Sequence, residues 1–354
     1  MYPALSILQA VGNRAETVLW VGSQGGMEAD LVSNAGITYK SVPAAGVHGV
    51  GLRALPGNIV KLLKGIIVSR RILREFKPDV LLFTGGYVAV PMAFAGIRTN
   101  SLLYVPDIEP GLALRALARF SSKIALTADE SKQYFRSTKK LVVTGYPTRA
   151  DFTPKNKIDA INNLGLTENK PVLLFIGGSK GAHAINTALF SHLSDLLRDF
   201  QVLHITGRED FEQSQLLKGQ LLPESASSYH PFPYLHQGIS DAFSAADLSV
   251  SRAGASILGE LPLMGLPAIL VPYPYAWRYQ KVNANYLVKH GAARFIENDK
   301  LDDQLVPAIH SLFADPVTLS SMRTAMSKLA TPQASSQLAE LVIALGTNPG
   351  GGSK

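Results

Sequence analysis

An apolar strand pattern runs straight into a glycine-rich turn and then a helical pattern at Phe175-Ile176-Gly177-Gly178-Ser179-Lys180-Gly181-Ala182. Glycine lets the backbone turn with positive φ and approach a ligand closely. The N–H groups and the dipole at the start of the following helix attract negative charge. The segment therefore predicts an α/β unit with a phosphate-binding turn, although the same pattern also occurs as a plain tight turn.

Short apolar runs alternate with helical patterns along the whole chain, which is typical of parallel sheets. At 354 residues the chain exceeds the usual size of one core, and a polar segment at residues 146–170 separates two series of runs. We expect an α/β protein of two Rossmann-like, doubly wound domains facing a cleft, at residues 1–147 and 148–354. The expected strands are 17–21, 80–83, 102–105, 141–143, 172–176, 201–205, 248–250 and 268–271.

Both ends of the chain carry further expectations. A helix starts near Pro3 with no strand before it, although a Rossmann-like half normally opens with a strand and a loop. We therefore expect the first strand of the N-terminal domain to be missing. The C-terminal helix is expected either to stay with the second domain or to pack back on the first. The glycine-rich residues 348–354 are expected to be disordered.

Charge is distributed unevenly along the chain. Residues 1–150 contain 18 Lys and Arg against 9 Asp and Glu, whereas residues 151–354 contain 16 against 18. The excess charge of +9 in the first half indicates a negatively charged partner, which is either nucleic acid or an anionic membrane surface. The alternative is a basic face that is merely solvated. There is no cysteine, which fits a reducing compartment such as the cytoplasm, and no apolar run long enough to span a bilayer.

Residues 59–77 are apolar and strongly cationic at once. Such a helix either lies on anionic lipid or packs on the core with a basic outer face. Nucleic-acid binding is not expected, because the segment carries aliphatic side chains rather than stacking aromatics. Its apolar members are Ile59, Val60, Leu62, Leu63, Ile66, Ile67, Ile72 and Leu73, and its cations are Lys61, Lys64, Arg70, Arg71, Arg74 and Lys77.

A second loop between strand and helix follows at Ser251-Arg252-Ala253-Gly254-Ala255, leading to Glu260. Such a loop can hold a diphosphate, and Glu260 is placed to accept hydrogen bonds from a ribose diol or, equally, to complement the helix dipole. The amide-rich stretch that contains Gln280 suits sugar hydroxyls or is a plain helix start.

The first half also has a glycine loop, Gly85-Gly86-Tyr87, directly after an expected strand. It too can cradle a phosphate. Arg149 lies at the expected hinge, where it contacts a sugar or phosphate or pairs with a carboxylate. The eight histidines, His183, His204, His230 and His236 among them, show no metal-ligand spacing, and a lone one such as His183 is more simply a satisfied helix or surface group.

Together and in order, these motifs resemble the bacterial UDP-N-acetylglucosamine:lipid I N-acetylglucosaminyltransferase family (MurG), which belongs to the GT-B glycosyltransferases. The resemblance extends nearly end to end and rests on an ordered set of motifs. These are Tyr2-Pro3-Ala4-Leu5, Met27-Glu28-Ala29-Asp30, Lys77-Pro78-Asp79-Val80, Gly85-Gly86-Tyr87, Gly145-Tyr146-Pro147-Thr148-Arg149, the glycine turn with Asn186, Ala246-Asp247, the Ser251 loop with Glu260, Gly265-Leu266-Pro267-Ala268, and Gln280 with Asn283-Ala284.

The resemblance implies an inverting transfer of N-acetylglucosamine from UDP-GlcNAc to a muramyl sugar on undecaprenyl diphosphate, in peptidoglycan synthesis. It implies no cofactor or metal, and a peripheral position on the cytoplasmic face of the membrane. Ser179 would contact the donor's diphosphate and Arg149 the donor's phosphate or sugar. Glu260 would contact the ribose, Leu235 the uracil and Gln280 the sugar. UDP would also touch Ala255, Ser256, Ile257, Leu258 and Gly259, the acceptor diphosphate would face Gly85, Gly86 and Tyr87, and the membrane would face residues 59–77.

The sequence departs from the family at three places. The family opens with a strand and a Gly-Gly-Thr-Gly-Gly-His loop whose histidine is the proposed base, and we expect coding sequence upstream of Met1 to supply both. Asp107 replaces an asparagine at a donor-binding position, where its carboxylate either accepts a proton or repels the donor phosphates. Tyr275-Ala276-Trp277 replaces His-Lys-Asp, which bears on donor selectivity.

Two other functions stay open on the sequence alone. One is a glycosyltransferase of the same architecture that acts on another lipid acceptor. The other is a catalytically silent UDP-sugar binder at the membrane.

Overall fold

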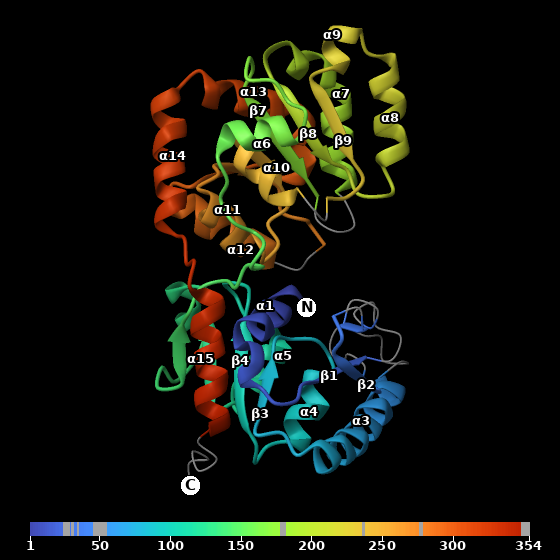
Figure 1. The fold of residues 1–354 in the computed structure, drawn as a ribbon, viewed down its shortest axis with the longest axis vertical. Coiled ribbons are helices and arrows are strands. Elements are labelled where there is room, and N and C mark those ends of the chain that lie inside the picture. Colours follow the sequence, from blue (N-terminus) through green and yellow to red (C-terminus); the bar gives the residue numbers. More distant parts are fainter. Residues whose placement is uncertain are drawn as a thin grey trace. The chain divides into compact units, whose positions relative to one another are not determined.

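The computed structural model describes residues 1–23, 29, 32–33, 35–44, 55–177, 182–235, 238–275 and 279–347. The chain divides into two compact units (Figure 1). Unit 1 comprises Met1–Arg149 and Gln333–Lys354, and unit 2 comprises Ala150–Pro332. Each unit is an α/β structure with parallel strands.

Unit 1 contains two parallel sheets, a pair β1-β2 and a four-stranded sheet in the order β3-β4-β5-β6. All six residues of β4 are buried, as expected for a central strand covered on both faces. The strands are β1 (Leu19–Ser23), β2 (Thr38–Val42), β3 (Val80–Phe83), β4 (Asn100–Val105), β5 (Lys123–Leu126) and β6 (Leu141–Val143).

The helices of unit 1 come from both ends of the chain. They are α1 (Tyr2–Val11), α3 (Leu55–Phe76), α4 (Ala89–Ala95), α5 (Leu112–Leu117) and α15 (Ala334–Thr347). The first and last of them, α1 and α15, lie side by side in Figure 1 and are in contact. The side chain of Asn100 also donates to the carbonyl of Leu345 at 2.9 Å, which ties α15 to β4.

Unit 2 is built on a single six-stranded parallel sheet in the order β12-β11-β10-β7-β8-β9. Its strands are β7 (Val172–Ile176), β8 (Gln201–Ile205), β9 (Tyr229–Phe232), β10 (Leu248–Ser251), β11 (Ala268–Leu270) and β12 (Ala293–Phe295). Its helices are α6 (Lys157–Asn163), α7 (His183–Asp199), α8 (Phe211–Gln220), α9 (Pro223–Ala226), α10 (Ile239–Ala245), α11 (Ile257–Met264), α12 (Tyr279–Lys289), α13 (Leu301–Phe313) and α14 (Pro316–Lys328).

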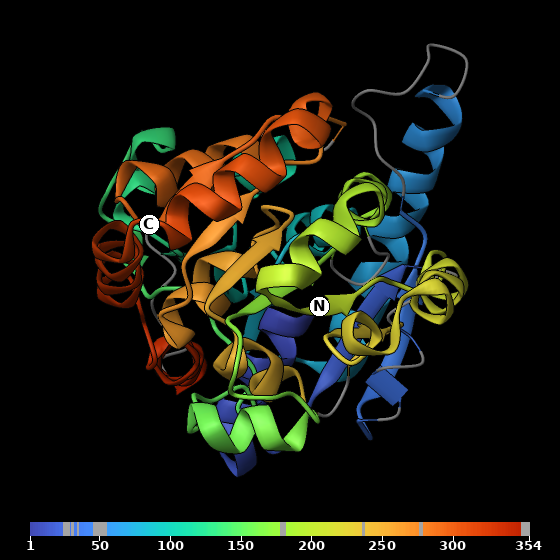
Figure 2. The same cartoon turned by 90° about the horizontal axis from the view of Figure 1, so that it is seen from above.

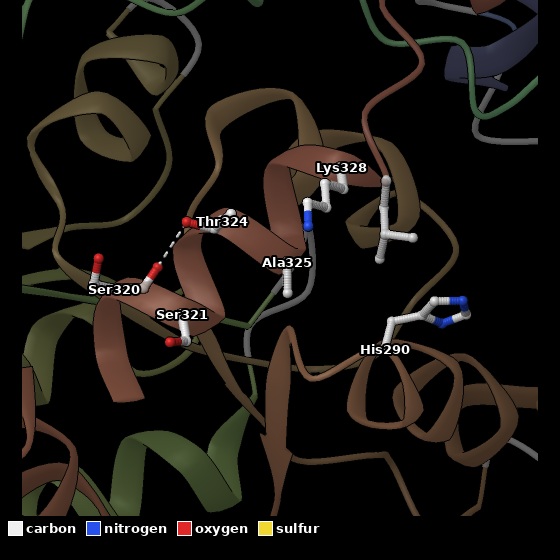
Figure 3. Close-up of a pocket in the computed structure, with 7 residues that line it drawn as sticks. His290, Ser320, Ser321, Thr324, Ala325 and Lys328 are labelled. Atoms are coloured by element: carbon white, nitrogen blue, oxygen red, sulfur yellow. Dashed lines mark hydrogen bonds between the residues drawn. The ribbon is translucent and has the colours of Figure 1, made fainter. Parts of the chain in front are cut away.

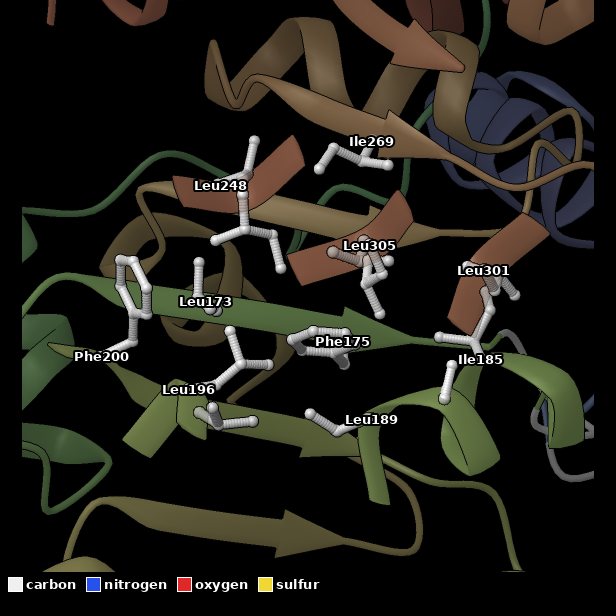
Figure 4. Packing of buried hydrophobic residues seen from close by; sticks show 14 of the residues in the cluster. Leu173, Phe175, Ile185, Leu189, Leu196, Phe200, Leu248, Ile269, Leu301 and Leu305 are labelled. Atoms are coloured by element: carbon white, nitrogen blue, oxygen red, sulfur yellow. The ribbon is translucent and has the colours of Figure 1, made fainter. Parts of the chain in front are cut away.

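The main core of unit 2 forms between the central strands and the helices α7 and α13. Phe175 on β7 packs among Ile185 and Leu189 of α7 and Leu305 of α13, all of them fully buried (Figure 4). Truncating one of these leucines to alanine costs about 2–5 kcal/mol. This rigid core fixes the carboxyl ends of the strands, where ligands bind in parallel sheets.

Candidate functional site

The glycine-rich turn of unit 2 begins at the end of β7. Ile176 lies beside Ser251 of β10 in the sheet register, and Ser251 lies beside Leu270 of β11. The loops after three neighbouring strands therefore leave the sheet at the same edge. Residues 178–181, with Ser179 among them, lie outside the described residues, and the chain is described again from Ala182 at the start of α7.

The loop after β10 offers backbone donors at this edge. The N–H groups of Leu258, Gly259 and Glu260 are bonded to carbonyls of Ala255 and Ser256 at 2.9–3.1 Å. Within the described part of the chain, the N–H groups of Ala255 and Ser256 themselves donate to no carbonyl. These two amides, ahead of the helix α11, form an arrangement that can bind an anion.

The side chains of this loop divide into two groups. Ile257, Leu258 and Gly259 are buried, so a ligand could reach only their backbone. Ala255, Ser256 and Glu260 are half-buried, and Glu260 lies in the first turn of α11. Glu260 thus follows the two amides by about one helical turn.

Two polar side chains brace the loop, the half-buried Arg252 and the buried Asn283, and sequence reasoning assigned no functional role to either. Arg252 donates to the carbonyl of Val271 at 3.1 Å and to Oδ1 of Asn298 at 2.7 Å, and its guanidinium lies 5.4 Å from the ring of Tyr273. Burial lowers the pKa of Arg252. Asn283 of α12 is fully buried and donates to the carbonyl of Ala253 at 3.1 Å. The loop is therefore held rigid before any ligand arrives.

Gln280 lies in the first turn of α12, at the same edge of the sheet. Its Oε1 accepts a hydrogen bond from the N–H of Tyr273 at 2.8 Å. The amide NH2 of Gln280 can therefore donate a hydrogen bond to a sugar oxygen. Residues 276–278, which include two of the departures from the family motif, lie outside the described residues.

Leu235 follows β9, which β8 separates from β7 in the sheet. It is half-buried, and the two residues after it, His236 and Gln237, lie outside the described residues. Its assignment to the uracil stays a prediction.

The predicted residues of unit 1 also follow strand ends. Gly85 and Gly86, after β3, have φ values of 113° and 85°, which only glycine adopts without strain, and Tyr87 is 61% exposed. The structure thus explains both glycines by backbone geometry and leaves their amides near the surface.

Asp107 follows β4, and Arg149 follows β6. The Thr127 hydroxyl lies 2.9 Å from the carbonyl of Pro106 and 2.8 Å from the hydroxyl of Tyr104, so the turn that carries Asp107 is braced from below. Burial raises the pKa of Tyr104 well above its ordinary value. The guanidinium of Arg149 lies 5.9 Å from the centre of the Tyr2 ring, in a cation–π contact.

Helix α3 exposes apolar and cationic side chains on one face. Ile59, Val60, Leu63 and Ile67 are 45%, 49%, 56% and 67% exposed. Gly65, Ser69 and Ile72 are buried on the other face. The exposed cations without a carboxylate partner among the described residues are Lys61, Lys64, Arg70 and Arg74, whereas Arg71 pairs with Glu75 at 2.8 Å. In Figures 1 and 2 this helix, in blue, lies at the margin of unit 1.

Unit 2 also has a hollow of about 420 Å³ between α14 and the residue after α12. Figure 3 shows its lining, which includes Ser320, Ser321, Thr324, Lys328 and His290. None of the predicted donor residues lines it. We assign it no function, and it supplies a control position at Lys328.

Among the described residues, no group of three or more histidine, aspartate or glutamate side chains is arranged to hold a metal ion. The sequence predicts His183 to be a satisfied helix or surface group, and the structure places its Nδ1 2.9 Å from Oδ1 of Asp210. His183 and Asn186 lie one turn apart and share a helix face. This spacing is the sequence signal that could have indicated a polar cluster at the start of α7.

Comparison with known proteins identifies two family domains in the chain. The glycosyltransferase family 28 N-terminal domain matches residues 1–126, and the family 28 C-terminal domain matches residues 172–338. A relative from Roseiflexus sp. (strain RS-1), named UDP-N-acetylglucosamine--N-acetylmuramyl-(pentapeptide) pyrophosphoryl-undecaprenol N-acetylglucosamine transferase, is 34% identical over 98% of this chain and 92% of its own length. A relative of the same name from Halalkalibacterium halodurans is 33% identical over 97% and 95%.

Among solved structures, MurG from Acinetobacter baumannii is similar with a TM-score of 0.74 at 22% identity, over 96% of this chain and 95% of that one. This likeness shows a shared fold, that of the GT-B glycosyltransferases. The fold class expected from the sequence is confirmed.

Proposed function

Because the chain belongs to the MurG family of UDP-N-acetylglucosamine transferases, we propose that it transfers N-acetylglucosamine from UDP-GlcNAc to lipid I and forms lipid II. The resemblance drawn from the motifs is thereby confirmed. The product serves peptidoglycan synthesis, and with it cell-wall biogenesis, cell shape and cell division.

One observation of the structure supports the proposal most directly. Strands β7 and β10 are neighbours, with Ile176 beside Ser251, and the Ala255–Ser256 amides follow β10. The glycine-rich sequence after β7, predicted to bind phosphate, therefore starts at the same edge of the sheet as these amides, which suits the two adjacent phosphates of a nucleoside diphosphate.

The residues of unit 2 are proposed to hold the donor. Ser179 contacts the diphosphate, and the loop from Ala255 to Glu260 holds UDP with the Glu260 carboxylate on the ribose hydroxyls. Gln280 donates to the sugar through its amide NH2. Leu235 lies against the uracil.

The residues of unit 1 are proposed to serve the acceptor and the chemistry. Gly85, Gly86 and Tyr87 face the acceptor diphosphate, and Arg149 contacts the donor's phosphate or sugar. The acceptor's C4 hydroxyl attacks the anomeric carbon, the bond from that carbon to the UDP oxygen breaks, and a base takes the hydroxyl proton. Among the described residues, Asp107 is the candidate for that base.

We further propose that the protein acts on the membrane surface through α3. Within the described ranges no helix combines the length and apolar character needed to cross a bilayer. The exposed face of α3 instead joins aliphatic side chains to cations that have no carboxylate partner in the part of the chain that the structure describes, the combination that binds anionic lipid from one side. This surface would bring unit 1 to a lipid-linked acceptor.

The function is tested with the purified full chain, radiolabelled UDP-GlcNAc and a lipid I analogue. We expect a labelled disaccharide product, and we expect Glu260→Ala to lower its rate of formation. Turnover with a different lipid acceptor alone would indicate another glycosyltransferase, and donor binding without any turnover would indicate a silent binder. Lys328→Ala is the matched control in the same unit.

A further inference from the structure

Two tyrosine rings lie exposed at the carboxyl edge of the unit 2 sheet, directly after β11. Tyr273 is 45% exposed and Tyr275 is 84% exposed. Their ring centroids lie 5.5 Å apart with the ring planes at 69°, which is an edge-to-face contact. Single exposed apolar side chains are common on protein surfaces and need no explanation. A packed aromatic pair at the edge where parallel sheets bind ligands is a candidate contact for one.

The chain holds the Tyr273 ring in place before any ligand arrives. Proline fixes its own φ and restricts the residue before it to extended conformations, so Pro272 and Pro274 limit the backbone on both sides of Tyr273. The guanidinium of Arg252 lies 5.4 Å from the Tyr273 ring and also donates to the carbonyl of Val271 at 3.1 Å. A tyrosine held in this way offers a large contact area at a low cost in conformational entropy.

A hydrogen bond joins the pair to the residue assigned to the donor sugar. The N–H of Tyr273 donates to Oε1 of Gln280 at 2.8 Å. Because the oxygen of this amide is engaged, the amide NH2 is the group that faces a ligand. A sugar that accepts from the NH2 of Gln280 therefore lies next to Tyr273.

The geometry and chemistry of the pair favour a pyranose ring over the other parts of a nucleotide sugar. Two aromatic rings at 69° cannot both stack on one planar base, whereas a pyranose presents C–H groups on its faces and around its edge. The face of an aromatic ring carries partial negative charge and attracts the partial positive charge of such C–H groups. The same negative charge makes the ring faces poor partners for a phosphate.

We propose that Tyr273 and Tyr275 are contact residues for the pyranose ring of the donor's N-acetylglucosamine, with the amide of Gln280 beside them. The inference rests on the proposed function, in which Gln280 holds that sugar. It gives a role to the segment in which Tyr275 stands in place of the family's histidine. The two rings strengthen the binding of the sugar and leave the binding of the UDP moiety unchanged.

The test compares UDP-GlcNAc with UDP, which lacks the sugar, by calorimetry on the full chain. We expect Tyr273→Ala and Tyr275→Ala each to weaken UDP-GlcNAc about fivefold, as the loss of one aromatic contact does, and to leave UDP unchanged. Tyr273→Phe and Tyr275→Phe should bind like the wild type, because the ring and not the hydroxyl makes the contact. UDP-glucose, which lacks the acetamido group, should lose the same factor as UDP-GlcNAc. The matched control is Leu222→Ala, which removes a 76% exposed apolar side chain of unit 2 and should change no ligand.

Four outcomes would overturn the inference. They are unchanged UDP-GlcNAc binding in both alanine variants, an equal loss for UDP, the full loss in the phenylalanine variants, and a loss for UDP-GlcNAc with none for UDP-glucose, since the last places the rings against the acetamido group. Because both tyrosines are exposed, their variants should fold normally, which thermal unfolding checks.

Glu260→Ala separates this test from the test of the proposed function. If Glu260→Ala weakens UDP and UDP-GlcNAc while the tyrosine variants change neither, only the sugar contact is refuted. If Glu260→Ala weakens neither ligand, the donor site itself is misplaced and the inference falls with it.

Discussion

The exposed face of α3 gives the most quantitative prediction. Leu63 and Ile67 are 56% and 67% exposed, and full burial of such a side chain contributes about 1.5–3 kcal/mol. Scaling by the exposed fractions gives about 3 kcal/mol for the two together, if the membrane covers what water now touches. The double variant Leu63→Gln/Ile67→Gln should therefore weaken vesicle binding about a hundredfold.

The cations of α3 provide a second, separable arm. Arg70 and Arg74 have no carboxylate partner among the described residues. Each cation near an anionic surface contributes roughly a fivefold increase in binding, so Arg70→Gln/Arg74→Gln should weaken binding about thirtyfold in 0.1 M salt. At 0.5 M salt this effect should shrink, because the Debye length falls, while the effect of the apolar pair should persist.

The assay is sedimentation of the full chain with vesicles of phosphatidylglycerol and phosphatidylcholine at the two salt concentrations. The matched control is Leu216→Gln on α8 of unit 2, because Leu216 is 63% exposed and thus as open to solvent as the tested residues. The reasoning is refuted if the Leu63/Ile67 double variant sediments like the wild type, or if Leu216→Gln causes the same loss.

Three other changes have predictable results. Glu260→Ala should raise the KM for UDP-GlcNAc about tenfold by removing hydrogen bonds to the ribose, with a smaller rise for Glu260→Gln in steady-state kinetics; an unchanged KM would argue against the ribose contact. His204→Leu should lower the free energy of unfolding in urea by roughly 2–4 kcal/mol, because the Tyr229 hydroxyl and the Asn186 oxygen lose their buried partner. Since burial gives His204 a pKa of about 3 when folded against about 6.5 when unfolded, the unfolded chain binds the proton first, and wild-type stability should fall by up to about 1.4 kcal/mol per pH unit as the pH drops from 6.5 towards 3. That slope should be missing in His204→Leu. Asp107→Asn should lower kcat by about a hundredfold or more if the carboxylate is the base, and a change in KM alone would remove Asp107 from that role.

The sequence pattern located most strands but not all of them. The expected runs coincide with β1, β3, β4, β6, β7, β8, β10 and β11, each of which carries a compact apolar run. The strands β2, β5, β9 and β12 were not predicted. They are three to five residues long and include groups such as Lys40, Pro231 and Arg294, so too few apolar positions remain to show a period of two.

The candidate loops were visible in the sequence because their chemistry is local. Gly85 and Gly86 have positive φ and are neighbours in the sequence. The small residues before a helix are likewise consecutive, so both kinds of loop can be recognised from a short stretch of sequence. The exposed face of α3 was visible for the same reason, since one helix presents residues at fixed spacing.

What the sequence determined by itself was the α/β class, the family and the loops that end on helix starts, since each depends on neighbouring residues or on motif order. Only the tertiary structure decided that the loops after β7 and β10 emerge side by side, that α15 packs against α1, and that His183 is tied through Asp210 and Asn186 to the buried His204. Strand order and long-range hydrogen bonds join residues that are distant in the chain, and no local pattern specifies which of the many possible pairings will satisfy every buried polar group.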